Sequence, residues 1–195
     1  PVVLPELKDH YPLLALTIVE GTSSTLVSQL KEGALDTAIL ALPYTTSDLL
    51  AFKFWQEDFY LISHTENGEA DHGEIDASQI DPSELMLLEE GHCLTGQALD
   101  LCKITNDQVI DVGAASLMTL VGLVDCKLGS TLAPEIALPY LVSSNPALRA
   151  QRLNEVGPHR ELALLVRANY SDIASVVELQ RFFSRRLEMR FAAVR

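Results

Sequence analysis

Apolar segments with strand spacing alternate with segments of helical spacing along most of the chain, and this pattern limits the possible folds. Short apolar runs bounded by turn residues predict buried strands, whereas apolar residues at i, i+3 and i+4 predict helices. We expect helices at 4–11, 23–32, 94–102, 116–125, 133–140 and 173–190, and strands at 13–19, 36–42, 52–54, 59–63, 84–89, 108–112, 130–132, 148–153 and 161–167. This alternation predicts an α/β fold with mostly parallel sheets flanked by helices.

Two expected strands, 52–54 and 59–63, follow each other almost directly and break the alternation. We interpret them, together with 161–167, as crossovers between two Rossmann-like lobes. Lobe I is expected at 1–58 and 163–195, and lobe II at 59–162. Because the chain opens on a helix, we expect the first strand of lobe I to lie in a preceding stretch of a longer protein. A cleft between such lobes is a typical small-molecule site.

Composition and charge exclude several classes of protein. The 195 residues are 48% hydrophobic, enough for a large core. The chain contains no apolar run of about 18 residues and no signal-peptide pattern, so no membrane association is expected. The net charge of −13 would repel phosphate backbones, so this chain should not bind DNA by itself. Three cysteines without a disulfide-scaffold composition indicate reduced thiols in the cytoplasm.

Two of the cysteines suggest thiol chemistry. Cys93 follows His92 at the expected start of a helix, where unpaired backbone N–H groups and a protonated imidazole would stabilise a thiolate. Glu89 and Glu90 oppose this effect. Cys102 lies nine residues later, on an apolar stripe with the helix's other apolar residues, so Cys102 is expected to be buried and Cys93 accessible.

A helix between the two cysteines would hold them apart. Nine residues at about 1.5 Å each separate the Cα atoms by about 13 Å, whereas a disulfide needs roughly 4.4–6.8 Å. A bridge between Cys93 and Cys102 would therefore require the helix to unwind. The alternative is that both cysteines are ordinary core residues, which is common for free thiols.

The remaining polar and sulfur-containing residues suggest no second chemistry. Cys126 is expected to be a packing residue at a helix end, and Ser116 a helix N-cap, with an anion site in the cleft as the alternative. The histidines and cysteines lack the short paired spacings of a zinc site, so no metal is expected. The arginines of the last helix are expected to face solvent.

Three stretches of the chain resemble the effector domain of LysR-type transcriptional regulators. Residues 30–36 and 129–134 are similar to the family in general, whereas residues 87–94, with Gln97 and Cys102 in register, resemble its peroxide-sensing members. The resemblance covers essentially the whole chain. It implies a fold like that of periplasmic binding proteins, no enzymatic activity, no cofactor and a role in transcriptional activation.

The resemblance also implies roles for individual residues. Cys93 would be the peroxidatic cysteine and Cys102 the resolving cysteine, joined through a sulfenic acid. His92 and Arg160 match residues that bind peroxide or favour the thiolate, and a family hydroxyl maps to Ser23 or, with a shift of one residue, Thr22.

The chain also departs from the family pattern. Thr95 and Gly96 stand where better-known members have Arg and Asp, so two charges beside the thiol are absent.

The partners implied are hydrogen peroxide, a thiol reductant for resetting, and further copies of the chain in a homodimer or homotetramer. Promoter DNA would be bound only through an N-terminal helix-turn-helix domain that is absent from this chain. The disulfide would refold residues near 91–108 and change subunit geometry. The alternatives are a carboxylate-responsive effector domain with its ligand near Ser116, Thr22 and Ser23, and a thiol peroxidase, which the absence of a Cys-x-x-Cys motif disfavours.

Overall fold

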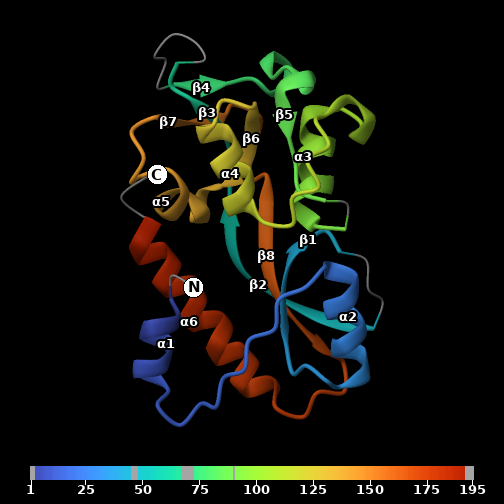
Figure 1. Cartoon of the computed structure of the whole chain (residues 1–195). Helices are drawn as coiled ribbons and strands as arrows, with labels where there is room; N and C mark the ends of the chain where they lie inside the picture. The colour runs from blue at the N-terminus through green and yellow to red at the C-terminus, as the bar shows by residue number, and fades with distance from the viewer. Residues whose placement is uncertain (1–2, 45–47, 67–72, 90, 192–195) are drawn as a thin grey trace. The chain divides into compact units, whose positions relative to one another are not determined.

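The computed structural model describes residues 3–44, 48–66, 73–89 and 91–191, and the chain divides into two compact units (Figure 1). Unit 1 comprises Pro1–Trp55 and Glu161–Arg195, and unit 2 comprises Gln56–Arg160. The chain therefore passes between the units twice, a few residues before each boundary expected from the sequence. Each unit contains a sheet with helices packed against it, so the predicted α/β class is confirmed.

Unit 1 is built on a three-stranded sheet with the strand order β1-β8-β2, in which β8 runs antiparallel to β1. Its elements are α1 (Leu4–His10), α2 (Ser23–Glu32), β1 (Ala38–Leu42), β2 (Leu49–Glu57), β8 (Arg160–Arg167) and α6 (Ile173–Phe191). Side chains alternate between the two faces of a strand. Ala163 and Leu165 of β8 accordingly pack with Leu30 of α2. Phe54 of β2 contacts Phe183 of α6, with the ring centroids 5.4 Å apart and the rings tilted by 47°.

The prediction of a strand at 13–19 is wrong. These residues adopt no regular secondary structure, and Leu13 is 97% exposed. Their apolar side chains favour a strand, but a strand also needs a neighbour for its backbone hydrogen bonds. No described strand of the three-stranded sheet pairs with this segment.

Unit 2 contains a five-stranded sheet with the order β4-β7-β3-β6-β5. Its elements are β3 (Phe59–His64), β4 (Glu74–Ile75), the 3₁₀ turns η1 (Ala77–Gln79) and η2 (Pro82–Glu84), β5 (Leu85–Met86), α3 (Cys93–Cys102), η3 (Asn106–Gln108), α4 (Leu117–Asp125), β6 (Ser130–Pro134), η4 (Glu135–Ala137), α5 (Leu138–Leu141) and β7 (Leu148–Leu153).

The sheet of unit 2 is mixed, and β1 pairs antiparallel with β8 in unit 1, which corrects the prediction of mostly parallel strands. In unit 2, β3 is antiparallel to β6 and β7, whereas β4 pairs with β7 and β5 with β6 in parallel. Parallel neighbours are normally joined by a crossover helix. The central strand β3 instead follows β2 after a single residue, so its direction is not set by a crossover.

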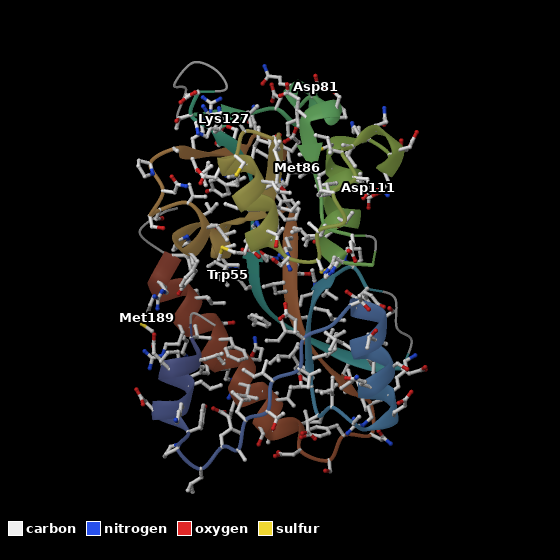
Figure 2. The ribbon with its side chains drawn as sticks, in the orientation of Figure 1. Trp55, Asp81, Met86, Asp111, Lys127 and Met189 are labelled. Atoms are coloured by element: carbon white, nitrogen blue, oxygen red, sulfur yellow. The ribbon has the colours of Figure 1, made fainter. Side chains whose placement is uncertain are left out.

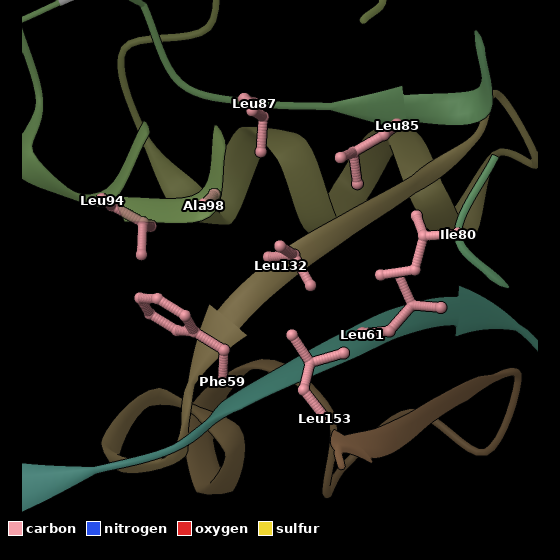
Figure 3. Close-up of a cluster of buried hydrophobic side chains, with 9 residues drawn as sticks. All are labelled: Phe59, Leu61, Ile80, Leu85, Leu87, Leu94, Ala98, Leu132 and Leu153. Carbon is pink, nitrogen blue, oxygen red and sulfur yellow. The ribbon is translucent and has the colours of Figure 1, made fainter. Parts of the chain in front are cut away.

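Helices α3 and α4 pack against alternate residues of the unit 2 strands. Phe59 and Leu61 of β3 share a core cluster with Leu94 of α3 (Figure 3). Ile62, the next residue along β3, belongs to a second cluster with Leu120 of α4. Met86, labelled in Figure 2, is fully buried in this second cluster. Because strand side chains alternate, α3 and α4 cover opposite faces of the sheet.

Other element boundaries in unit 2 differ from the sequence predictions. The expected strand 84–89 is only two residues long as β5, and the expected strand 108–112 is reduced to one bridge between Ile110 and Met86. Residues 106–108 instead form a 3₁₀ turn closed by Thr105 and Gln108. The helix expected at 133–140 begins after β6, as η4 followed by α5. Hydrogen bonds within the turn at 106–108 thus take the place of bonds to a neighbouring strand, because β5 is only two residues long.

Candidate functional site

Cys93 is the first residue of α3, so its thiol lies at a helix N-terminus as predicted. His92 is the N-cap, with extended backbone and no side-chain capping bond. Cys93 and His92 are both partly buried, and Cys93 is a free thiol. The unpaired N–H groups of the first turn carry partial positive charge, which favours an anion such as a thiolate.

Arg160, the first residue of β8, lies beside this thiol. Its Nη2 atom is 4.0 Å from the Sγ atom of Cys93. The Arg160 side chain is 16% exposed and its Nη1 atom is 3.8 Å from Oε1 of Glu57. A guanidinium close to a thiol stabilises the thiolate, which is the nucleophilic form. The structure thus places Arg160 and Cys93 together within unit 2.

Glu57 is a neighbour of this site that sequence reasoning missed. Its side chain is fully buried, and its Oε2 atom accepts a hydrogen bond of 2.9 Å from the backbone N–H of Ile136. The sequence shows only a glutamate at the end of an apolar strand, and nothing in that pattern distinguishes a buried carboxylate from an exposed one. Its burial depends on the return of β8, more than 100 residues later in the chain.

Cys102 ends α3 and packs against the core cluster that contains Leu94 and Ala98. Both cysteines are partly buried, so the expected contrast between a buried Cys102 and an accessible Cys93 is wrong. Burial, with a smaller contribution from the charge of Glu155, raises the pKa of the Cys102 thiol to about 11. Cys102 is therefore a protonated thiol at neutral pH.

The two residues that depart from the family pattern have distinct structural roles. Thr95 is buried, and its hydroxyl donates a hydrogen bond of 2.9 Å to the backbone carbonyl of Leu88. This bond ties the first turn of α3 to the segment before it. Gly96 lies within the helix, and a Cβ atom added there would meet nothing within 4 Å. Glycine in a helix interior costs about 1 kcal/mol relative to alanine, so Gly96 lowers the intrinsic stability of α3.

The other sequence candidates lie on other elements than α3 and β8. Thr22 is the N-cap of α2 and Ser23 its buried first residue. Both belong to unit 1, whereas Cys93 and Arg160 belong to unit 2. Ser116 caps α4 by accepting a hydrogen bond of 3.2 Å from the N–H of Thr119, as predicted.

Two remaining sequence expectations concern Cys126 and Glu90. Cys126 is exposed at the end of α4, which corrects its interpretation as a packing residue. Its position after the last turn of the helix places it outside the core. Glu90 lies outside the described residues.

Within the described part of the chain, no group of three or more His, Cys, Asp or Glu residues is arranged to hold a metal ion. Among the same residues, no helix is both long enough and apolar enough to cross a membrane. Unit 2 holds two free thiols at the ends of α3, one of them beside a guanidinium, and a third free thiol, Cys126, exposed on α4.

Comparison with known proteins gives a consistent family. The model of the LysR substrate binding domain matches residues 1–188. The chain is 34% identical over 181 residues to a "Probable hydrogen peroxide-inducible genes activator" of Streptomyces viridosporus, covering 92% of this chain and 58% of that protein. It is 38% identical over 171 residues to the "HTH-type transcriptional regulator EstR" of Acinetobacter baylyi, covering 85% of this chain and 55% of that protein.

A solved structure is similar over nearly the whole chain. The hydrogen-peroxide-bound C206S mutant of Corynebacterium glutamicum OxyR superposes with a TM-score of 0.88 at 29% identity, covering 98% of this chain and 61% of that one. The chain thus spans little more than half the length of the curated relatives that it matches.

Proposed function

Since the chain belongs to the LysR substrate-binding domain family, we propose that it is the regulatory domain of a transcriptional activator that senses hydrogen peroxide. LysR-type proteins are transcriptional regulators and not enzymes. The relatives named as peroxide-inducible activators support the stimulus. The position of Cys93 at a helix N-terminus and beside Arg160 supports the chemistry.

The first chemical step is oxidation of Cys93. Its thiolate attacks one oxygen of hydrogen peroxide, the O–O bond breaks, and the other oxygen leaves as hydroxide and takes up a proton to become water. The products are a Cys93 sulfenic acid and water. Arg160 stabilises the thiolate, and His92 is placed next to the sulfur in sequence to donate a hydrogen bond to peroxide. A further hydroxyl from Ser23 or Thr22 stays a prediction from the family resemblance.

The second step joins the two sulfurs. The Cys102 thiol attacks the sulfenic sulfur, an S–S bond forms and water leaves. In α3 the two Cα atoms are separated by about 13 Å, from nine residues at about 1.5 Å each, so the helix must unwind before the bond can form. An external thiol reductant would restore both thiols by thiol–disulfide exchange.

The weakness of α3 suits it to this change. Gly96 lowers its intrinsic stability, whereas the Thr95 hydrogen bond and the burial of Leu94 and Ala98 hold it in place. Burying a leucine contributes about 1.5–3 kcal/mol, so a few contacts decide between helix and coil. Refolding near residues 91–108 would then alter contacts between subunits.

We propose a cytoplasmic homodimer or homotetramer in which unit 1 and unit 2 correspond to two regulatory lobes. Promoter DNA would be bound by a helix-turn-helix domain in another part of the protein. The net charge of −13 supports the assignment of DNA binding to that other part.

The single observation that carries this proposal is the contact between Arg160 and a free Cys93 at the start of the helix that ends in Cys102. The test is titration of the chain with hydrogen peroxide, followed by peptide mapping without reduction. A Cys93–Cys102 bridge at near-stoichiometric peroxide is expected, and Cys93→Ser should abolish all fast oxidation. Cys102→Ser should stop at a sulfenic acid that dimedone traps, while Cys126→Ser should leave the bridge unaffected because Cys126 is exposed on α4.

A ligand-responsive domain without redox switching is the second candidate, favoured by the 38% identity to EstR, a regulator whose name mentions no peroxide. The same titration separates the two. If all three thiols stay reduced, or oxidise slowly and without order, the peroxide proposal fails and small carboxylates become the ligands to screen.

A further inference from the structure

The Arg160 guanidinium lies between two groups that compete for its charge. Its Nη2 atom faces Cys93 at 4.0 Å, and its Nη1 atom faces the Glu57 carboxylate at 3.8 Å. Its buried Nε atom has no hydrogen-bond partner among the described residues. The guanidinium is therefore held mainly by electrostatic attraction, and its effect on the thiol depends on how much of its charge Glu57 already balances.

Glu57 is fixed in this position by the fold. Its side chain is fully buried, and its second carboxylate oxygen, Oε2, accepts the N–H of Ile136 at 2.9 Å. A buried carboxylate needs a cation nearby, because an uncompensated charge in the interior costs several kcal/mol. Arg160 supplies that cation. While Cys93 is a neutral thiol, the charges of Glu57 and Arg160 balance each other.

We infer that Glu57 is a positioning residue that balances the charge of Arg160 and thereby limits the fraction of Cys93 present as reactive thiolate. When Cys93 ionises, one guanidinium must serve two anions. Interactions between charges in a partly buried site are several-fold stronger than in water, so each anion weakens the benefit that the other receives. This inference deepens the proposed function, on which its biological meaning rests.

Other titratable groups adjoin the pair in sequence or through the backbone: Asp58, His92, Glu135, His159 and Glu161. Glu161 is paired with Lys53, with Oε2 and Nζ 2.7 Å apart. Asp58 is engaged by Arg152, with Nη2 and Oδ2 2.6 Å apart. The Nδ1 atom of His159 accepts the N–H of Phe59 at 3.1 Å and lies 3.7 Å from Oδ1 of Asp58, and its Nε2 atom lies 2.9 Å from the carbonyl oxygen of Glu155. The inference rests on the contact between the Glu57 carboxylate and the Arg160 guanidinium.

The test is the pH profile of Cys93 alkylation by iodoacetamide in the reduced chain, read at the Cys93 peptide by mass spectrometry. In Glu57→Gln the amide keeps the size of the side chain but removes its charge. We expect the pH of half-maximal rate to fall by about one unit, the lower limit for loss of a nearby charge. Below that pH, the variant holds about tenfold more thiolate than the wild type, but each thiolate is a weaker nucleophile. The alkylation rate of Cys93 should therefore be about threefold higher than in the wild type.

Two further variants keep the test decisive. Glu57→Asp retains the negative charge but moves it away from Arg160 by the length of one methylene group. The pH of half-maximal alkylation should therefore fall by less than in Glu57→Gln, and this variant keeps the test available if Glu57→Gln does not fold. Arg160→Gln should shift the profile to higher pH. Thr131→Val is the matched control, because it removes a buried hydroxyl that donates to the carbonyl of Met86 at 2.8 Å, without changing any charge. Its profile should match the wild type.

An unchanged profile in both Glu57 variants, or a shift to higher pH, would overturn the inference. The readout needs no peroxide and no disulfide, so it is independent of the proposed function. A chain whose Cys93 profile shifts as expected but which forms no bridge with peroxide would refute the proposed function alone.

Discussion

At the scale of single residues, the two thiols of α3 differ in what surrounds them. Cys93 has a guanidinium and a helix N-terminus beside it, whereas Cys102 has an apolar cluster and the charge of Glu155. A thiol that remains protonated attacks slowly, and a thiolate attacks quickly. The order of events proposed above, Cys93 first and Cys102 second, follows from these surroundings.

The raised pKa of Cys102 predicts a pH dependence of stability. Its pKa rises from an ordinary value of 9.0 to about 11 in the folded chain. The folded state therefore holds this proton more tightly than the unfolded state, and stability that is complete below pH 9 is lost as the pH rises to about 11. The melting temperature of the reduced wild type should fall faster between these pH values than that of Cys102→Ser. Parallel curves for the two proteins would contradict the burial of the thiol.

Some of the site was accessible from the sequence and some was not. The positions of Cys93 and Cys102 at the two ends of one helix could be predicted because helix spacing is a local feature, and their roles stay predictions. Glu57 and the Thr95 hydrogen bond were missed because both depend on tertiary contacts, with Arg160 and Ile136 for the first and with the Leu88 carbonyl for the second. A buried charge or a buried hydroxyl leaves no periodic signal.

At the scale of elements, α3 is the part of unit 2 whose stability the redox proposal requires to be small. The reduced state keeps the helix and the oxidised state must lose it, so any change that strengthens α3 makes the disulfide harder to form. The intrinsic stability of α3 therefore contributes to the reduction potential of the Cys93–Cys102 couple.

Gly96→Ala tests that coupling. The new methyl group meets nothing within 4 Å, so the helix should gain about 0.5–1 kcal/mol. The reduction potential of the Cys93–Cys102 couple should rise by about 10–20 mV, because 1.4 kcal/mol corresponds to about 30 mV. Equilibration with glutathione buffers measures this shift.

A matched control lies in α4. Gly122 also sits within a helix, and a Cβ atom added there meets nothing within 4 Å. Gly122→Ala should stabilise the reduced and oxidised forms equally and leave the potential unchanged. Equal shifts for both glycines would show that the potential follows overall stability and not the helix between the cysteines.

Elements whose signals are local were predicted well. α2 and β7 occupy the residues expected, since a cap with a helical pattern defines α2 and an apolar run defines β7. The strands expected at 13–19 and 108–112 failed because pairing, not propensity, decides whether an extended segment becomes a strand. The prediction of mostly parallel strands was wrong because β3 enters its sheet directly after β2, without a crossover helix.

At the scale of the whole molecule, the net charge of the chain bears on the proposal that another domain binds DNA. The chain carries 27 acidic and 14 basic side chains, for a net charge of −13. Such a surface repels phosphates, and salt screens this repulsion without creating attraction. Fluorescence anisotropy of a labelled duplex should detect no binding by this chain at 50 mM salt in either redox state. Saturable binding at micromolar concentration would contradict the assignment of DNA recognition to another domain.

The central claim is that formation of the Cys93–Cys102 bridge unwinds α3. Hydrogen–deuterium exchange, measured by mass spectrometry before and after stoichiometric peroxide, tests it most directly. The account predicts that residues 93–102 lose amide protection on oxidation while α4 (Leu117–Asp125), on the opposite face of the sheet, keeps it. A mapped Cys93–Cys102 disulfide in a chain whose α3 amides remain protected would contradict the account.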